Sequence, residues 1–178
     1  YREEVLFNSE TDSGTKIFIF NNNLRFSDVS FSYDNTNTAV SHVNLLIKKG
    51  EMIGLIGPSV AGKTTVVDLL LRLFEPGEGK IMLDGQPINE ISLKDWRRRI
   101  GYVSQDIFLM NDTIESNIRF YDKNIKEEDM VAATKMANIF EFIERQPQKF
   151  STVIGERGVK LSGGEKQRII LARILVRH

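Results

Sequence analysis

Cysteine is absent from this sequence of 178 residues, and histidine occurs only at His42 and His178. A chain without cysteine has no disulfide framework and no thiol nucleophile. With only two histidines, it also lacks the ligands of a Cys/His zinc cluster. Burial of apolar side chains must therefore stabilise the fold, and a chain of this length can bury a sufficient core.

An excess of either charge is missing too, because 24 Lys and Arg balance 24 Asp and Glu. This balance argues against a strongly basic nucleic-acid-binding protein, so no nucleic-acid partner is expected. Long apolar runs are also missing, since none approaches the ~18 residues of a membrane span. With 41% hydrophobic and 27% charged residues, the composition is that of a globular domain.

The first part of the chain changes character near residue 24. Residues 1–23 are polar and rich in Asn and Ser, apart from the apolar island Ile17–Phe20. We expect a linker here, with an edge strand at the island as an equal alternative. Residues 24–178 are expected to form the domain. Two strands are predicted at its start, because Leu24–Tyr33 is rich in β-branched and aromatic residues and Val43–Ile47 alternates apolar with polar residues.

Strand and helix patterns then alternate. Met52–Ile56 is a short continuous apolar run, typical of a strand buried on both faces of a parallel sheet. Further strands are predicted at Lys80–Asp84 and Ile100–Val103, and helices over residues 62–74, 92–99 and 127–145 and from Gly163 onward. This order predicts an α/β fold with a mostly parallel sheet and flanking helices, plus an N-terminal antiparallel sheet.

Between the Met52–Ile56 run and the next helix, the stretch Gly57-Pro58-Ser59-Val60-Ala61-Gly62-Lys63-Thr64 matches the pattern G-x-x-x-x-G-K-[ST]. Such a loop turns successive N–H groups toward a phosphate, and the following helix adds the positive end of its dipole. We expect Lys63 to reach the β- and γ-phosphates and the Thr64 hydroxyl to ligate Mg²⁺. A dinucleotide-binding loop is excluded here, because G-x-G-x-x-G is absent.

Val60 departs from this type of loop, which usually carries glycine at that position. A β-branched residue adopts a positive φ only at an energetic cost. Either Val60 has an ordinary φ, or the loop is strained and binds nucleotide less well.

A second informative stretch is Leu161-Ser162-Gly163-Gly164-Glu165-Lys166-Gln167-Arg168. Two glycines before a helix again offer N–H groups and the positive end of a dipole to an anion. Ser-Gly-Gly alone is a weak signal, but it is a strong one in a chain that also carries the phosphate loop.

With both motifs in this order, residues 24–178 resemble the nucleotide-binding domain of exporter-type ATP-binding cassette (ABC) transporters. The loop Gly57–Thr64 resembles the Walker A motif, and Leu161–Glu165 resembles the signature motif. Gln105 is similar to the Q-loop glutamine, and Tyr33 is similar to the aromatic residue that stacks on adenine.

The resemblance implies a P-loop NTPase core, an N-terminal antiparallel β subdomain and a helical subdomain, with ATP and Mg²⁺ as cofactors. Lys63 and Gln105 are then the candidate catalytic residues, and Thr64 and Gln105 the candidate Mg²⁺ ligands. The residues expected to bind ATP are Tyr33, Gly57, Pro58, Ser59, Val60, Ala61, Gly62, Lys63, Thr64, Thr65, Ser162, Gly163 and Gly164.

The resemblance also implies partners. Two such domains, identical or different, pair head to tail, so that ATP on Lys63 and Thr64 of one is capped by Ser162 and Gly164 of the other. Closure of the pair moves a transmembrane domain through its coupling helices, which places the domain at the cytoplasmic face of a membrane, as part of an integral membrane transporter. Thr152–Gly158 is similar to the segment that exporters use for this contact, and residues 108–110 are further candidates.

Two departures from the family pattern remain. Glu165 stands where Gln is commoner, and we expect its side chain to lie off the phosphate. The sequence stops at His178, before the Walker B strand with its Mg²⁺-associated Asp and catalytic Glu. We therefore expect an incomplete domain that binds ATP and hydrolyses it poorly or not at all. The alternatives are a soluble cassette ATPase acting on nucleic acid or ribosomes, and a degenerate, non-hydrolysing regulatory site.

Overall fold

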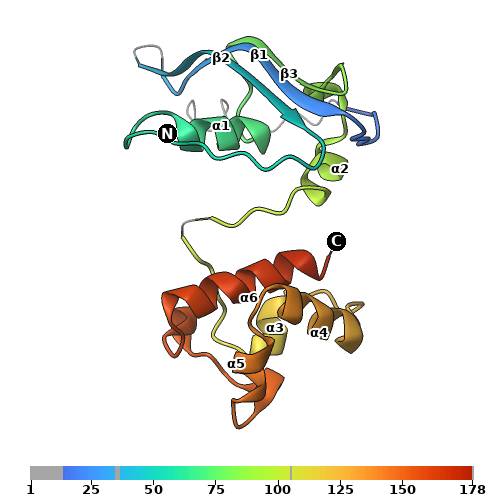
Figure 1. Cartoon of the computed structure of the whole chain (residues 1–178), viewed down its shortest axis with the longest axis vertical. Coiled ribbons are helices and arrows are strands. Elements are labelled where there is room, and N and C mark those ends of the chain that lie inside the picture. The colour runs from blue at the N-terminus through green and yellow to red at the C-terminus, as the bar shows by residue number, and fades with distance from the viewer. Residues whose placement is uncertain (1–13, 35–36, 105, 178) are drawn as a thin grey trace, which may run out of the picture. The chain divides into compact units, whose positions relative to one another are not determined.

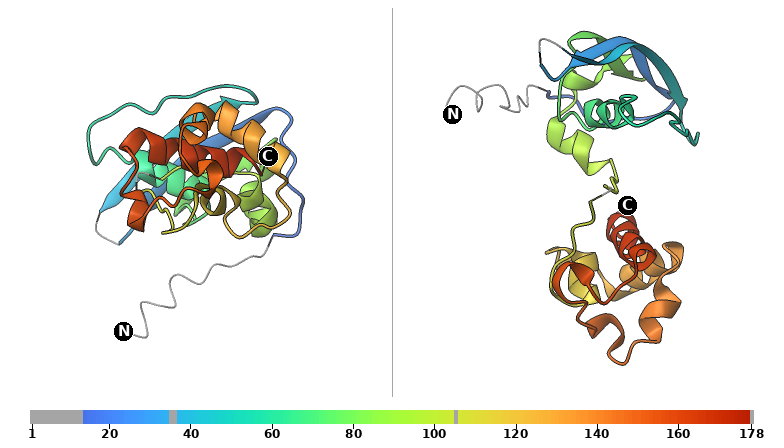
Figure 2. Two further views of the ribbon diagram at one scale, coloured as in Figure 1. Left: turned by 90° about the horizontal axis from the view of Figure 1, so that it is seen from below. Right: turned by 90° about the vertical axis from the view of Figure 1, so that its left-hand side faces the viewer.

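The computed structural model describes residues 14–34, 37–104 and 106–177. The chain divides into two compact units, Tyr1–Ile100 and Gly101–His178 (Figures 1 and 2). Each unit has a buried apolar core of its own. We call Tyr1–Ile100 the N-terminal unit and Gly101–His178 the C-terminal unit.

Over its described residues, the N-terminal unit contains one antiparallel sheet with the strand order β2-β1-β3-β4. Its strands are β1 (Asn23–Ser32), β2 (Thr38–Lys48), β3 (Glu78–Leu83) and β4 (Gln86–Pro87). Along β1, Leu24 and Phe26 are buried while Arg25 between them is exposed, as the two-residue period of a strand requires. The predicted antiparallel sheet is confirmed.

Helices α1 (Lys63–Leu70), η2 (Ile88–Glu90) and α2 (Leu93–Arg98) complete this unit, and α1 runs along one face of the sheet (Figure 1). Leu69 of α1 is fully buried in the same core as Phe26 and Ile81. The indole N–H of Trp96, on α2, donates to the carbonyl of Leu70 at 2.8 Å. Helix α1 ends earlier than predicted, and Arg72, just beyond it, has a left-handed φ of 54°.

Two strand predictions are wrong for this structure. Met52–Ile56 and Ile100–Val103 form no strand, and the mostly parallel sheet predicted from them is not formed. Met52 is 97% exposed and Ile56 is 100% exposed. An apolar run becomes a buried strand only where neighbouring strands take up its backbone N–H and C=O groups. Within the described residues, no strand pairs with either segment.

Part of the predicted linker lies against the N-terminal unit. The backbone of Lys16 bonds to Glu90 and Ser92, in an isolated bridge beside Ile91. The backbone N–H of Phe18 donates to the Asp95 carboxylate at 2.6 Å, and the Phe18 ring lies 5.3 Å from the Trp96 ring. The alternative edge strand at Ile17–Phe20 is not formed.

The Asp84 carboxylate binds the backbone at the C-terminal end of this N-terminal segment. Its carboxylate accepts the backbone N–H groups of Asn21, Asn22 and Asn23 at 2.5, 2.8 and 2.7 Å. Burial acts to raise the pKa of Asp84, but these three donors, with the charge of Lys49, lower it below its ordinary value. The ionised form of Asp84 therefore joins the N-terminal segment to the β3–β4 turn.

The C-terminal unit is helical over its described residues. Its elements are α3 (Ile114–Arg119), α4 (Glu127–Met136), α5 (Phe140–Glu144), η3 (Lys149–Ser151), η4 (Glu156–Gly158) and α6 (Gly163–Leu175). The helix predicted over residues 127–145 is split, because Asn138 has a φ of 55° that ends α4. None of the helices in the described part of the chain has the length and apolarity that a bilayer crossing requires.

The Asp84 contact predicts a pH-dependent stability. Because its pKa is lowered on folding, Asp84 stabilises the fold above about pH 4, and this contribution is lost as pH falls further. We expect Asp84→Asn to cost no more than about 1 kcal/mol at pH 7, since solvent screens the site, and less near pH 3. Urea unfolding followed by fluorescence of Trp96, the single tryptophan, measures the difference.

Asp122→Asn, in the C-terminal unit, is the control, because among the described residues the Asp122 carboxylate accepts one N–H group, that of Asn124 two residues on. An Asp84→Asn effect that does not change between pH 7 and pH 3 would contradict this account of the segment.

Candidate functional site

The phosphate-loop residues lie beside a cavity in the N-terminal unit. This cavity measures about 360 Å³ and is lined by Tyr33, Asp34, Asn37, Thr38, Ala39, Val60, Ala61, Gly62, Lys63, Thr64 and Thr65. Seven of these lining residues are predicted ATP-binding residues, contributed by the position just after β1, the loop and the first turn of α1. The sequence did not single out the lining residues Asp34, Asn37, Thr38 and Ala39 as a site, although the polar turn pattern is visible there.

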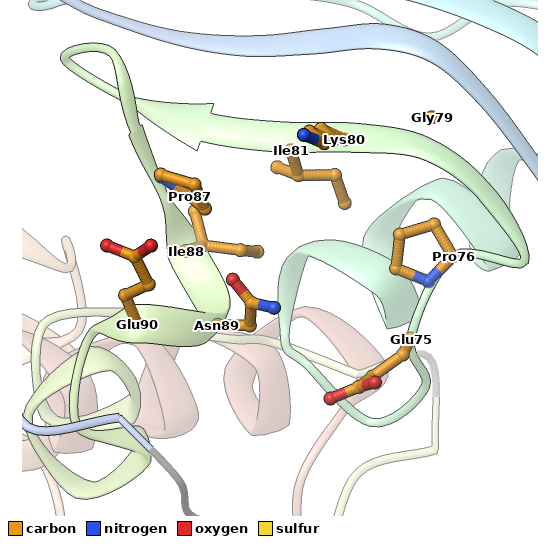
Figure 3. A pocket seen from close by; sticks show the side chains of 9 residues that line it. All are labelled: Glu75, Pro76, Gly79, Lys80, Ile81, Pro87, Ile88, Asn89 and Glu90. Atoms are coloured by element: carbon orange, nitrogen blue, oxygen red, sulfur yellow. The ribbon is translucent and has the colours of Figure 1, made fainter.

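A second cavity of about 370 Å³ lies in the same unit, lined by residues of the loop before β3, of β3 and β4, and of η2 (Figure 3). Pro76, Ile81 and Ile88 give it apolar walls, and Glu75 and Glu90 place carboxylates on two sides. No predicted ATP-binding residue lines it. The predicted nucleotide site therefore corresponds to the first cavity.

The N-terminus of α1 opens at the first cavity. Gly62 precedes the helix with a φ of 75°, and a Cβ there would lie 2.5 Å from Val40 and 2.7 Å from the carbonyl of Ala39. Only glycine fits this position. No side chain of the described residues caps α1, and its first turn carries no acidic residue. Its first N–H groups and the positive end of its dipole are thus available to an anion.

Three predicted ATP-binding residues, Lys63, Thr64 and Thr65, lie in the first turn of α1, and each makes different contacts. The Lys63 ammonium donates to the carbonyls of Gly57 and Pro58 at 2.8 and 2.6 Å. Thr64 is exposed on the cavity wall, so its hydroxyl is accessible. Thr65 is buried and hydrogen-bonded, with Oγ1 3.2 Å from the hydroxyl of Tyr33.

Tyr33 is fixed at the cavity from both ends of its side chain. Its hydroxyl also donates to the Asp68 carboxylate at 3.2 Å. Its ring makes edge contacts with Phe31 and Phe74, with centroids 4.9 and 5.2 Å away. The residue remains 54% exposed, so part of the ring is open to a flat ligand. Asp68 belongs to no motif that would reveal this role in the sequence.

Of the two alternatives for Val60, the structure has the strained one, in which the residue takes a positive φ. Its φ is 70°, and the side chain is fully exposed. The left-handed region costs an L-residue with a Cβ roughly 1–2 kcal/mol, and no buried contact of the side chain offsets that cost. The alternative of an ordinary φ is wrong.

The signature residues lie in the other unit, at the start of α6. Ser162 is the N-cap of this helix, and its hydroxyl accepts the N–H of Glu165 at 3.4 Å. The Glu165 carboxylate accepts the N–H of Ser162 at 2.7 Å, which completes a capping box. The expectation for Glu165 agrees with this geometry, because its side chain turns back onto the backbone. Gly163 and Gly164 are exposed.

Of the two predicted Mg²⁺ ligands, Thr64 is described and Gln105 lies outside the described residues. Over residues 14–34, 37–104 and 106–177, no group of three or more His, Asp or Glu side chains is arranged to hold a metal. A hydroxyl beside a phosphate site fits Mg²⁺, which is bound through few protein ligands together with phosphate oxygens and water. The donors on this chain thus fit a metal that arrives with its nucleotide.

The chain is similar to known proteins over most of its length. The ABC transporter family matches residues 40–178. The chain is 42% identical over 156 residues to an ABC transporter ATP-binding protein of Bacillus subtilis, covering 88% of this chain and 27% of that protein. It is 43% identical over 156 residues to an ATP-dependent lipid A-core flippase of Chromobacterium violaceum, covering 87% of this chain and 27% of the flippase.

A solved structure of a bacterial Atm1-family ABC exporter with ATP bound is similar, with a TM-score of 0.87 and 38% identity. The similarity covers 96% of this chain and 30% of the exporter chain. The chain thus spans about a quarter to a third of these proteins. The family match, the relatives and the shared fold together show that this chain belongs to the ABC transporter family.

Proposed function

We propose that this chain binds Mg·ATP at the α1 cavity and that, in its parent protein, hydrolysis of this ATP powers export of a substrate across a membrane. The observation that carries the proposal is the uncapped N-terminus of α1, opening beside Lys63 and Thr64 in one cavity. An anion there meets N–H donors, a dipole and an ammonium within a few residues.

Each group at the cavity has a distinct role. Lys63 exchanges its bonds to the carbonyls of Gly57 and Pro58 for bonds to phosphate oxygens, because a charged acceptor is the stronger partner. Thr64 holds Mg²⁺, which neutralises phosphate charge when bound. Tyr33 offers the open part of its ring to adenine, and its bonds to Thr65 and Asp68 keep that ring oriented. Gln105, outside the described residues, acts on Mg²⁺ and the attacking water.

The signature end of α6 forms the second half of a site on a partner domain, which is either a second copy or a different domain. The exposed Gly163 and Gly164 present N–H groups, and Ser162 presents its hydroxyl, toward the γ-phosphate of the partner's ATP. The capping box supports this role, because it fixes the orientation of Ser162. Two domains that share ATP in this way close only when it is bound.

A transmembrane domain is the other proposed partner, which would hold this chain at the cytoplasmic face of the membrane. Both sequence-predicted contact segments carry exposed apolar side chains, with Phe108 63% and Val153 42% exposed. The chain just after residues 108–110 pairs with the other segment, because Val153 bridges to Thr113 and Ile154 donates to the carbonyl of Asp112.

A second candidate function is a degenerate site that binds ATP without hydrolysing it. The positive φ of Val60 favours it, because strain in the phosphate loop weakens the fit to nucleotide. The rate of ATP hydrolysis by the parent protein distinguishes this function from the proposed one, because a degenerate site would not hydrolyse ATP. Balanced charge and exporter relatives give no support to a nucleic-acid-directed ATPase.

Calorimetric titration of the 178-residue chain with Mg·ATP tests the proposal. We expect saturable binding, weakened by at least about tenfold in Lys63→Ala, because an ammonium bonded to phosphate is lost. Lys94→Ala is the control, since Lys94 is an exposed lysine on α2 of the same unit. Equal affinities of the wild type and Lys63→Ala would overturn the proposal.

A second titration tests the strain at Val60. Val60→Gly removes the Cβ at a φ of 70°, so we expect Mg·ATP to bind up to about fivefold more tightly. Unfolding should show a net gain below about 1 kcal/mol, because glycine also increases the entropy of the unfolded chain. Val60→Ala keeps the Cβ, so we expect it to gain neither affinity for Mg·ATP nor stability. A gain of the same size in Val60→Ala would mean that backbone strain is not the cause.

A further inference from the structure

Arg173 joins α6 to the segment that precedes and forms α3. Its Nε donates to the carbonyl of Asn117 at 2.7 Å, and its two terminal nitrogens donate to the carbonyl of Phe108 at 3.1 Å and to Oδ1 of Asn117 at 3.2 Å. The guanidinium also lies 4.4 Å from the centroid of the Phe120 ring. One side chain thereby uses all three of its nitrogens and its flat face.

Asn117 extends this contact into the loop before α3. The residue is fully buried, and its Oδ1 also accepts the N–H of Met110 at 2.8 Å. Its Nδ2 donates to the carbonyls of Met110 and Thr113 at 3.1 and 3.0 Å. Arg173 and Asn117 together fix the backbone at both ends of the segment from Phe108 to Asn117.

An exposed aromatic edge lies at the two ends of this region, with Phe108 at the start of the segment and Phe120 and Tyr121 just after α3. Phe108 is 63% exposed and Tyr121 is 82% exposed, with the Phe120 ring 6.3 Å and 5.4 Å from theirs. The other end of α6 carries Ser162 as its N-cap. Arg173 lies ten residues beyond Gly163, about 15 Å along the helix axis at the usual rise.

We propose that Arg173 is a positioning residue that links the aromatic edge of Phe108, Phe120 and Tyr121 to the signature end of α6. A transmembrane partner seated on the edge then sets the orientation of Ser162 through a single helix. This inference rests on the proposed function, because it assigns that partner and that role of Ser162.

Packing alone does not account for an arginine at this position. The core of the unit already packs α6 through Ile169, Ile170 and Ala172, which are apolar and buried. Burial, and then the charge of Arg177, lower the pKa of Arg173 to about 10, so it stays cationic at neutral pH. A partly buried cation is costly, and an apolar residue would fill the same space. What the cation adds is a set of directional bonds to Phe108 and Asn117.

A distance measurement tests the link directly. The chain has no cysteine, so Phe108→Cys with Gly163→Cys gives a unique pair for spin labels, within one unit. Phe108 is exposed, its bond to Arg173 uses only the backbone, and nothing lies within 4 Å of a Cβ at Gly163. We expect a narrow distance distribution by pulsed electron paramagnetic resonance, and a distribution about twice as broad when Arg173→Lys is added, because Lys cannot reach all three acceptors.

Two control variants distinguish the loss of the Arg173 contacts from a general loss of stability. Ile143→Val removes a methyl group from the same core, at a cost of about 1 kcal/mol. Arg145→Leu removes an exposed arginine whose Nε donates to the carbonyl of Glu141 in the adjacent helix α5. Both should keep the narrow distribution. An unchanged width in Arg173→Lys, or an equal broadening in Ile143→Val, would overturn the proposal.

Turnover of the complete transporter tests the consequence. Since the cavity at α1 is untouched, Arg173→Lys should leave the KM for ATP unchanged and lower kcat about fivefold. The variants Ile143→Val and Arg145→Leu should keep the KM and the kcat of the wild type. If the transporter with wild-type sequence neither binds nor hydrolyses ATP, the proposed function fails, whatever the distances show. If it turns over and Arg173→Lys retains full kcat, this inference alone fails.

Discussion

The positive N-terminus of α1 is the feature on which the proposed chemistry of the N-terminal unit depends. Gly62 makes it possible, because only a residue without a Cβ passes between Val40 and Ala39 at a φ of 75°. The antiparallel sheet supplies that wall through β2, and Leu69 anchors the helix in the core beneath it. Tyr33 reaches the same cavity because β1 ends there and its hydroxyl bonds back to α1. Fold and site are thus joined through one short helix.

Local patterns predicted those parts of the fold that depend on local interactions. The alternation along β1 and β2, the glycine before α1 and the Ser-Gly-Gly start of α6 each determine nearby backbone. Each element forms there, although β2 is longer and α1 is shorter than predicted. The strand at Met52–Ile56 failed because its burial depends on neighbours that the run itself cannot specify. The break at Asn138 was missed because apolar spacing continues across it.

The same division holds for the candidate site. Lys63, Thr64 and Tyr33 were found because a motif or a family resemblance names them, and the structure brings all three to one cavity. Asp68, Asn117 and Arg173 were missed, because they act through contacts between elements distant in sequence and carry no motif. The positive φ of Val60 decided between two alternatives that residue type alone left open.

Amide hydrogen exchange with and without Mg·ATP tests the central claim most directly, because it reports each backbone N–H group. If ATP binds at the positive end of α1, exchange at Gly62–Thr65 slows when nucleotide is added, while the strands of the sheet are unaffected. Exchange at Gly62–Thr65 that does not change at saturating Mg·ATP would contradict the account, because the N–H groups assigned to phosphate would then be unoccupied.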